Sequence, residues 1–206
     1  MCGRYVGEKG PVICDACLRT LPRTEQAVVR QNSTEEVVGT HAAAFLFFEK
    51  EDPIQQVVHK MKYADQPKIG QFLGHQAAME LQYTDFFDGI DVIVPMPLHP
   101  RRLRERGYNQ SEYIARGLSE VLGIPVDTTH VMRIKDTPKQ ALQDAQGRKE
   151  NMQNAFAVNH PEQIYHKHIL VVDDLITTGE TMRSCLKAMK KFRGATFTVF
   201  ALCKAR

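Results

Sequence analysis

The residues best suited to chemistry in this chain are two adjacent carboxylates, Asp173 and Asp174. They follow the apolar run 169–172, which has the composition of a buried strand, and they precede a hydroxyl-rich turn at residues 177–181. Neighbouring strand positions face opposite sides, so one carboxylate would face a packed interior or a cleft, where an unpaired charge is unfavourable. We therefore favour a binding site over helix capping and turn formation, the common structural roles of Asp and Thr.

The turn at residues 177–181 predicts an anion site. A helix that begins there offers unpaired backbone N–H groups and the positive end of its dipole. A phosphate would bind the amides and hydroxyls of the turn. The two carboxylates would accept hydrogen bonds from neighbouring sugar hydroxyls or help to hold a divalent cation.

A second chemical signal is the basic segment 99–108, which follows the apolar run 91–95. It carries four arginines against one glutamate, a local charge of +3. Arginine forks suit phosphate oxygens, and ligands of open α/β sheets collect at the loops that follow strands. We expect a phosphate-binding loop, although charge clusters are usually solvated surface. The arginines are Arg101, Arg102, Arg104 and Arg106.

The elements that must position these segments alternate along the chain. Strand-like apolar runs occur at residues 42–48, 91–95 and 169–172, and a last strand is expected at residues 196–202. The clearest helix runs from Asn109, a predicted N-cap, to Gly123. Other helical patterns carry Ile54, Val57, Val58 and Met61, then Ile69, Phe72, Leu73 and Ala77, and finally Met182, Leu186 and Met189. This alternation predicts an α/β fold with an open, mainly parallel sheet covered by helices on both faces.

Composition describes an ordinary globular protein of 206 residues, with 43% hydrophobic residues, 25% charged residues and a net charge of +3. That charge is too small to argue for a nucleic-acid or membrane partner. No apolar run approaches the roughly 18 residues of a transmembrane helix, and residues 1–10 lack the apolar stretch of a secretory signal. We therefore expect a soluble, cytoplasmic protein. The sequence motifs of P-loops, nucleophile elbows and HExxH metalloproteases do not occur.

The first forty residues lack clear periodicity and predict a small appendage and linker before a domain at residues 41–206. They hold three of the five cysteines. Cys14 and Cys17 have the spacing that lets two thiolates bind one zinc ion, and Cys2 would supply a third ligand. A structural zinc site requires four ligands, so the zinc prediction stays open. Cys185 and Cys203 are expected in the core.

Three segments, in order, resemble the ComF branch of the type I phosphoribosyltransferase superfamily. They are residues 94–110, residues 137–140 with Arg148 and Asn151, and residues 173–181, which look like the phosphoribosyl pyrophosphate motif. The resemblance implies that Asp173 and Asp174 hold the ribose 2′ and 3′ hydroxyls. It also implies that the 5′-phosphate is cradled by Thr177, Thr178, Gly179, Glu180 and Thr181.

The same resemblance implies a reaction. Phosphoribosyl would pass to an unidentified acceptor with release of pyrophosphate, and Mg²⁺ would be bound mainly by the ligand's own pyrophosphate and hydroxyls. The basic segment 99–108 would bind the pyrophosphate, and the sequence does not distinguish which of its four arginines touches the ligand. Residues 136–154 resemble the catalytic loop that closes over such sites and would place Lys139 or Arg148 on the leaving group, with an ordinary surface loop as the equal alternative. Lys60, Lys62 and Tyr63 indicate only a polar rim near the site.

ComF relatives also leave two questions open. Members carry two Cys-x-x-Cys pairs, and Cys2 looks like the second cysteine of the first pair, so either the chain starts upstream or a zinc ligand is lost. ComF proteins are associated with competence and DNA uptake, which makes a non-catalytic protein that binds single-stranded DNA the alternative function. Its candidate surface holds seven basic residues without an acid, although weak stacking support favours a solvated helix side: Arg183, Lys187, Lys190, Lys191, Arg193, Lys204 and Arg206.

Overall fold

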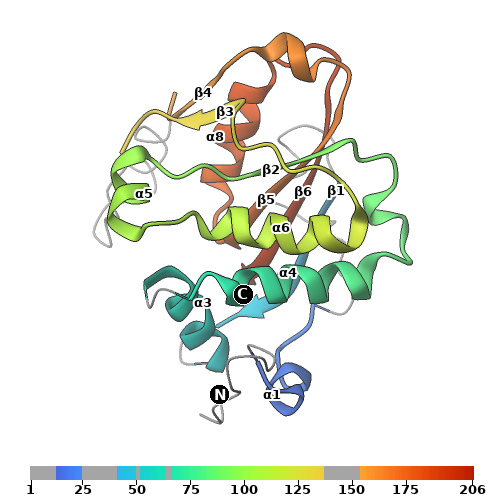
Figure 1. Cartoon of the computed structure of the whole chain (residues 1–206), viewed down its shortest axis with the longest axis vertical. Coiled ribbons are helices and arrows are strands. Elements are labelled where there is room, and N and C mark those ends of the chain that lie inside the picture. The colour runs from blue at the N-terminus through green and yellow to red at the C-terminus, as the bar shows by residue number, and fades with distance from the viewer. Residues whose placement is uncertain (1–12, 25–40, 50–51, 64–65, 137–153) are drawn as a thin grey trace.

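The centre of the molecule is a parallel β-sheet, seen in a computed structural model that describes residues 13–24, 41–49, 52–63, 66–136 and 154–206. Within these residues the sheet has the strand order β1-β6-β5-β2, and each neighbouring pair is parallel (Figure 1). The last strand continues to Ala205, three residues beyond its predicted end. The open parallel sheet predicted from the sequence is confirmed. Its strands are β1 (His41–Phe48), β2 (Val92–Pro95), β5 (His168–Ile176) and β6 (Thr196–Ala205).

Helices cover both faces of the sheet. Alternate residues of β5 belong to different cores: Leu170 and Val172 pack in one, whereas Ile169 and Val171 pack in the other. Residues of α3 (Pro53–Tyr63), α4 (Lys68–Leu81) and α6 (Gln110–Leu122) fill the first core. The second core holds residues of α8 (Glu180–Met189) and of the antiparallel pair β3 (Val131–Arg133) and β4 (Phe156–Val158). The alternation of strand side chains thus produces the predicted two-sided packing.

The close packing of α4 against α6 sets the position of the α6 N-terminus (Figure 1). A Cβ atom at Gly74 would lie 2.3 Å from the carbonyl oxygen of Ile114, and one at Gly117 would lie 2.0 Å from that of Gln71. Only glycine allows the two backbones to approach this closely. As predicted, Asn109 caps α6 by accepting a hydrogen bond from the Ser111 amide, and Gly123 ends it with a φ of 69°.

The basic segment was expected to be a loop, and that expectation is wrong. Residues 100–106 form a short helix, α5 (Pro100–Arg106). The His99 ring caps it, Pro100 occupies its first position, and Gly107 ends it with a φ of 81°. Proline at the start and glycine just after the end are helix-boundary signals, and they can also be read as loop residues when only six residues separate them.

Residues 13–24 pack against the sheet. They contain α1 (Asp15–Arg19), and the side chains of Ile13 and Leu21 are buried in the first core. The Phe47 amide donates to the Pro22 carbonyl oxygen at 2.8 Å, which ties this segment to β1. The predicted domain boundary at residue 40 lies outside the described residues. The remaining elements of the described residues are two short 3₁₀ helices, Asp85–Phe87 and Pro161–Ile164.

Among the described helices, none is both long and apolar enough to cross a membrane.

Candidate functional site

Asp173 and Asp174 lie inside β5, not after it as the sequence pattern indicated. The strand continues to Ile176 and stays paired with β6 beyond the two carboxylates. On its other side, β2 ends at Pro95, opposite Val172. At Val172, where β5 was expected to end, it is the neighbouring strand β2 that ends. The carboxylates therefore lie where β5 extends past β2, at the carboxyl edge of the sheet. This is the edge where open α/β sheets bind ligands.

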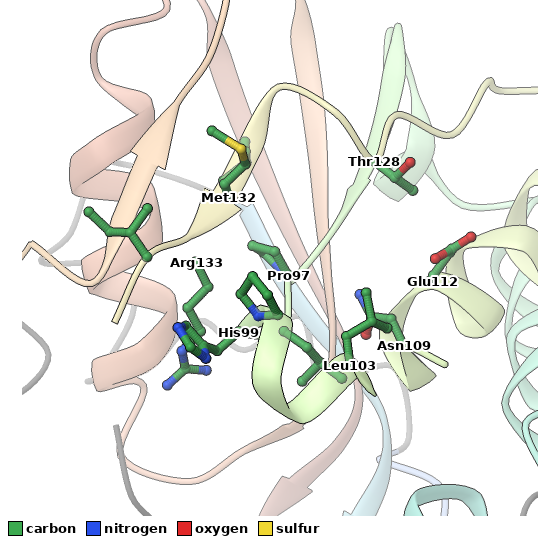
Figure 2. Close-up of a pocket in the computed structure, with 12 residues that line it drawn as sticks. Pro97, His99, Leu103, Asn109, Glu112, Thr128, Met132 and Arg133 are labelled. Carbon is green, nitrogen blue, oxygen red and sulfur yellow. The ribbon is translucent and has the colours of Figure 1, made fainter. Parts of the chain in front are cut away.

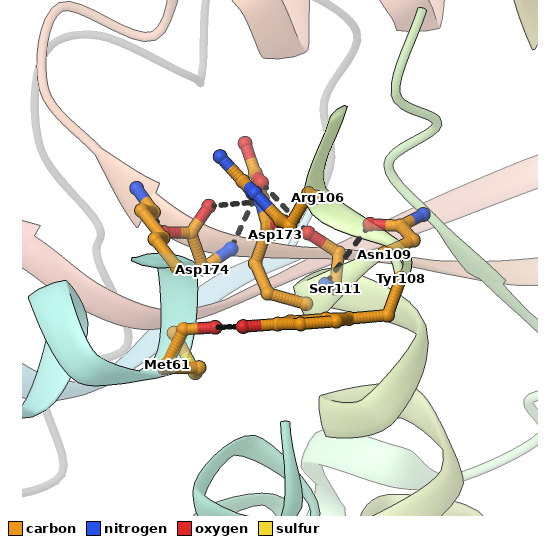
Figure 3. Close-up of polar contacts among 9 residues, drawn as sticks. Met61, Arg106, Tyr108, Asn109, Ser111, Asp173 and Asp174 are labelled. Carbon is orange, nitrogen blue, oxygen red and sulfur yellow. Dashed lines mark hydrogen bonds and ion pairs between the residues drawn. The ribbon is translucent and has the colours of Figure 1, made fainter. Parts of the chain in front are cut away.

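Protein donors surround the two carboxylates, which are only 8% and 5% exposed (Figure 3). Asp173 Oδ1 accepts hydrogen bonds from Ser111 Oγ at 3.1 Å and from the Asp174 amide at 2.8 Å. Asp174 Oδ1 accepts one from Gln110 Nε2 at 3.0 Å. Asp174 Oδ2 forms an ion pair with Lys62 Nζ. The first turn of α6 and the last turn of α3 thus bind the pair from two directions.

Burial raises the pKa of Asp173 to about 7, and the neighbouring Asp174 charge adds to this effect. The Asp174 amide, Lys62 and Ser111 act in the opposite direction and lower the same pKa. Asp173 therefore exists in both its protonated and ionised forms near neutral pH. A carboxyl group in this condition both donates and accepts hydrogen bonds, which suits contact with sugar hydroxyls.

Arg106 is the arginine of α5 that the structure brings to the carboxylates. It is half-buried, its Nη1 donates to Gln110 Oε1, and burial lowers its pKa while the nearby Asp174 charge raises it. Arg101 and Arg102 instead pair with Asp136, each at 3.3 Å. Arg104 is exposed on the same helix. Arg106 is thus linked to the carboxylate pair through Gln110, which also donates to Asp174.

The predicted phosphate turn has the expected form. Thr177 and Thr178 are exposed, and Gly179 takes a left-handed conformation with a φ of 76° directly before α8. The Arg183 guanidinium donates to the Thr178 carbonyl oxygen at 2.6 Å and pairs with Glu180. Thr181 lies in the first turn of the helix. Arg183 thus holds the backbone of the turn, and Thr177 and Thr178 remain exposed.

Four residues of this site were missed or underrated from the sequence. Gln110 and Ser111 are buried polar residues at the start of α6, and nothing in the helical pattern distinguished them from surface positions. Lys62 was assigned only to a polar rim. Burial lowers the pKa of Arg133, in β3, and the nearby Asp173 charge partly offsets this effect by raising that pKa. The sequence offered one signal for these positions, because Gln110 ends the first segment that carries the family resemblance, residues 94–110.

A cavity of about 520 Å³ lies beside the N-terminus of α6, and neither Asp173 nor Asp174 lines it (Figure 2). It lies between the segment that follows β2, the starts of α5 and α6, and β3. Arg133 lines it and connects it electrostatically to Asp173, and Asn109 lines it near the α6 cap. Most of the remaining lining is apolar, including Leu103 and Met132. The cavity is large enough for a small organic ligand.

The other predicted site residues fall into two groups. Cys2, Lys139 and Arg148 lie outside the described residues. Cys14 and Cys17 are half-buried at the start of α1, and no group of three or more potential metal ligands occurs in the part of the chain that the structure describes. Burial raises the pKa of the Cys185 and Cys203 thiols, and both lie in the core as predicted.

A domain model and two named relatives place this chain in the same protein family. The phosphoribosyl transferase domain matches residues 109–206. DNA utilization protein YhgH of Escherichia coli K12 is 31% identical over 155 residues, which cover 74% of this chain and 67% of that protein. Competence protein F of Haemophilus influenzae is 31% identical over 159 residues, covering 75% and 69% of the two chains.

Solved structures are less similar. The allosteric regulatory enzyme of purine biosynthesis has a TM-score of 0.44 at 18% identity, over 68% of this chain and only 29% of that chain. Adenine phosphoribosyltransferase from Saccharomyces cerevisiae has a TM-score of 0.42 at 16% identity, over 67% and 69% of the two chains. These likenesses are too weak to support an argument about function. On its fold, its domain match and its relatives, the chain belongs to the ComF family of proteins with a type I phosphoribosyltransferase fold.

Proposed function

We propose that this protein binds phosphoribosyl pyrophosphate and transfers its phosphoribosyl group to an acceptor, with release of pyrophosphate. The observation that carries the proposal is the buried carboxylate pair of β5, placed at the carboxyl edge of the sheet beside a turn that leads into α8. A phosphorylated sugar needs hydroxyl acceptors next to an anion site, and one continuous segment of this chain supplies both.

The sugar would bind at the carboxylates. Among the described residues, the hydrogen bonds given to Asp173 fall on Oδ1. Its Oδ2 is thus available to a ribose hydroxyl, and the second hydroxyl would bind Asp174. A hydrogen bond from a hydroxyl to an ionised carboxylate is worth about 1.5–3 kcal/mol, and Asp173, whose pKa is about 7, also donates one in its protonated form. The pair would therefore contribute much of the binding free energy.

The 5′-phosphate would bind the turn that follows. The left-handed Gly179 ends the turn, and the first amides of the ten-residue helix α8 come directly after it. These amides and the exposed hydroxyls of Thr177 and Thr178 are donors for phosphate oxygens, and the helix dipole favours the negative charge. Arg183 supports the turn by donating a hydrogen bond to the Thr178 carbonyl oxygen.

The pyrophosphate would lie toward Arg106. In a transfer at the anomeric carbon, negative charge gathers on the departing pyrophosphate, and a preset cation lowers the barrier. Arg106 is charged, half-buried and oriented by Gln110. Lys139 and Arg148 remain the predicted loop residues that would close over the leaving group.

Magnesium is implied by this chemistry, and the residues present fit an ion that arrives with its ligand. The described residues offer hard oxygen atoms from carboxylates and hydroxyls but no cluster of three potential metal ligands. Mg²⁺ favours phosphate oxygens and keeps several waters, so it does not need a complete protein cage. When bound, it would neutralise part of the pyrophosphate charge.

Isothermal titration with phosphoribosyl pyrophosphate and Mg²⁺ tests the proposal. We expect saturable binding that weakens about ten- to 150-fold in Asp174→Asn, because a charge-assisted hydrogen bond is lost. Glu162→Gln, an exposed carboxylate on a 3₁₀ turn, is the matched control and should bind as the wild type does. A folded wild-type protein that does not bind the ligand would refute the proposal. Release of pyrophosphate with candidate acceptors then tests transfer.

A second function has one specific observation in its favour. The end of α8 and the residues after it expose Lys187, Lys190, Lys191 and Arg193, and relatives carry the names DNA utilization protein and competence protein F. A non-catalytic factor that binds single-stranded DNA would use this surface. Aromatic support for base stacking is poor, as predicted, because Phe192, Phe197 and Phe200 are buried. Salt-dependent binding of an oligonucleotide that Lys187→Gln/Lys190→Gln weakens, without pyrophosphate release, would favour this alternative.

Zinc and a cytoplasmic location stay predictions. Cys14 occupies the N-cap position of α1 without a side-chain capping hydrogen bond, and Cys17 lies within the helix, so both thiols belong to one short helical turn. Metal analysis of the purified chain decides the zinc question. One equivalent of zinc that Cys14→Ser loses would confirm it, and wild-type protein purified without chelator and free of zinc would refute it.

A further inference from the structure

The last turn of α3 contacts both the Arg106–Tyr108 segment and the carboxylate pair. The Tyr108 hydroxyl donates to the Met61 carbonyl oxygen at 2.7 Å (Figure 3). The Arg106 guanidinium lies 5.3 Å from the centre of the Tyr63 ring. Between these two contacts, Lys62 pairs with Asp174. Three consecutive residues of α3 thus contact the Arg106–Tyr108 segment or the carboxylate pair.

The Lys62–Asp174 pair is largely shielded from water. Only 19% of the Lys62 side chain and 7% of the Asp174 side chain are exposed. Gln110 holds one Asp174 oxygen and Lys62 the other, so both the charge and the orientation of this carboxylate depend on neighbouring side chains. A carboxylate buried to this degree needs a counter-charge, because an uncompensated buried charge is strongly unfavourable.

We propose that Lys62 is a positioning residue of the candidate site, which neutralises and orients Asp174 so that the hydroxyls of a ribose 5-phosphate ligand meet a preset pair of carboxylates. The proposal rests on the proposed function, since it assigns a role in binding the same ligand. It differs from direct contact with pyrophosphate, because the Lys62 ammonium is already bound to Asp174. Tyr108 supports the arrangement by holding the turn of α3 in place.

This proposal predicts a split between ligands. If Lys62 acts through Asp174, its loss weakens every ligand that carries the ribose and leaves pyrophosphate alone unaffected. If Lys62 contacted the pyrophosphate instead, its loss would weaken phosphoribosyl pyrophosphate and free pyrophosphate but spare ribose 5-phosphate. A merely structural role would affect all three ligands to the degree that the fold is lost.

The experiment measures the dissociation constants of these three ligands by calorimetry, with Mg²⁺ present, for the wild type, Lys62→Met and Lys62→Arg. Lys60→Met is the matched control, because Lys60 is exposed two residues earlier on the same helix. We expect Lys62→Met to weaken phosphoribosyl pyrophosphate and ribose 5-phosphate by the same factor, about tenfold or more. Lys62→Arg should restore most of the affinity, and Lys60→Met should behave as the wild type.

Two further variants make the test decisive. In an Asp174→Asn background, adding Lys62→Met should cause no further loss of ribose 5-phosphate affinity, because the residue through which Lys62 acts has been changed. Tyr108→Phe leaves the charge intact and frees the α3 turn, so it should show the same ligand pattern more weakly. It keeps the test valid if Lys62→Met does not fold, which thermal unfolding would report.

The outcomes separate the two proposals. Wild-type binding with unchanged ribose 5-phosphate affinity in Lys62→Met would overturn the role of Lys62 and leave the proposed function standing. Additive losses in the Asp174→Asn background would also overturn it. Failure of the folded wild type to bind any ribose ligand would overturn the proposed function, and the role of Lys62 with it.

Discussion

The buried Asp173 makes the stability of this protein depend on pH in a defined direction. Its pKa is about 7 in the folded chain, against an ordinary value of 3.8. Below about pH 4 the group is protonated in both the folded and unfolded states, so it has no effect on their difference. As the pH rises from 4 to 7, the unfolded chain ionises freely and the folded chain resists, so the free energy of unfolding falls.

The magnitude follows from the two pKa values. A pKa difference of about 3 corresponds to about 4 kcal/mol, which is the stability lost once the pH exceeds the folded pKa. Asp173→Asn removes this ionisation while keeping the size of the side chain and an acceptor for Ser111. We therefore expect the variant to be more stable than the wild type at pH 8, with the difference shrinking steadily toward pH 4.

Urea denaturation at intervals between pH 4.5 and 8.5 measures this effect. The comparison is the difference in unfolding free energy between Asp173→Asn and the wild type, with Glu162→Gln as the control for an exposed carboxylate. A difference that does not change with pH, or that grows as the pH falls, would refute the assignment of Asp173 as the raised carboxyl group. A stable, folded variant that has lost ligand binding would show that this residue is retained for function.

Three other predictions concern packing, charge and pyrophosphate. Gly117→Ala should destabilise the fold by about 1–3 kcal/mol in urea denaturation, because its Cβ atom would lie 2.0 Å from the Gln71 carbonyl oxygen and push α4 away from α6. Ser119→Ala, on the same helix, is the control. Equal stability of the two variants would contradict the packing argument. Arg106→Met should weaken pyrophosphate binding about tenfold by calorimetry, whereas the exposed Arg116→Met should not; equal affinities would place the pyrophosphate elsewhere. Asp174→Asn should lower the free energy of unfolding at pH 7, because Lys62 loses its buried partner. Stability that returns in Asp174→Asn/Lys62→Met would identify the unpaired Lys62 ammonium as the cause.

Much of the fold could be predicted because its signals are local. The apolar runs of β2 and β5 are short and apolar on both faces, as buried parallel strands require. The boundaries of α6 follow from Asn109 and Gly123, whose cap conformations are set by their own chemistry. The order of the strands and the close approach of α4 to α6 could not be predicted this way, since both depend on contacts between distant segments.

The site shows the same division. Asp173, Asp174 and the turn to α8 are contiguous, so their chemistry was visible in one stretch of sequence. Lys62 is more than 100 residues from Asp174, and its local pattern is that of a helix end with other basic residues nearby. Arg106 could not be separated from Arg101 and Arg102 until the structure placed Asp136 beside the latter two. Long-range pairing, rather than residue type, decides which cation serves the carboxylates.

The end of β5 connects stability with function. If β5 stopped with β2 at Val172, the two carboxylates would lie in a solvated loop and fold stability would not depend on their charge. Instead the strand continues along β6, and the pair is buried between Ser111, Gln110 and Lys62. Folding alone gives no reason to bury two adjacent acids, because neutral side chains of the same size, with Lys62 replaced as well, would avoid the penalty. The proposed binding site would account for the arrangement, because such a site requires carboxylates held in place for a ligand even at a cost in fold stability.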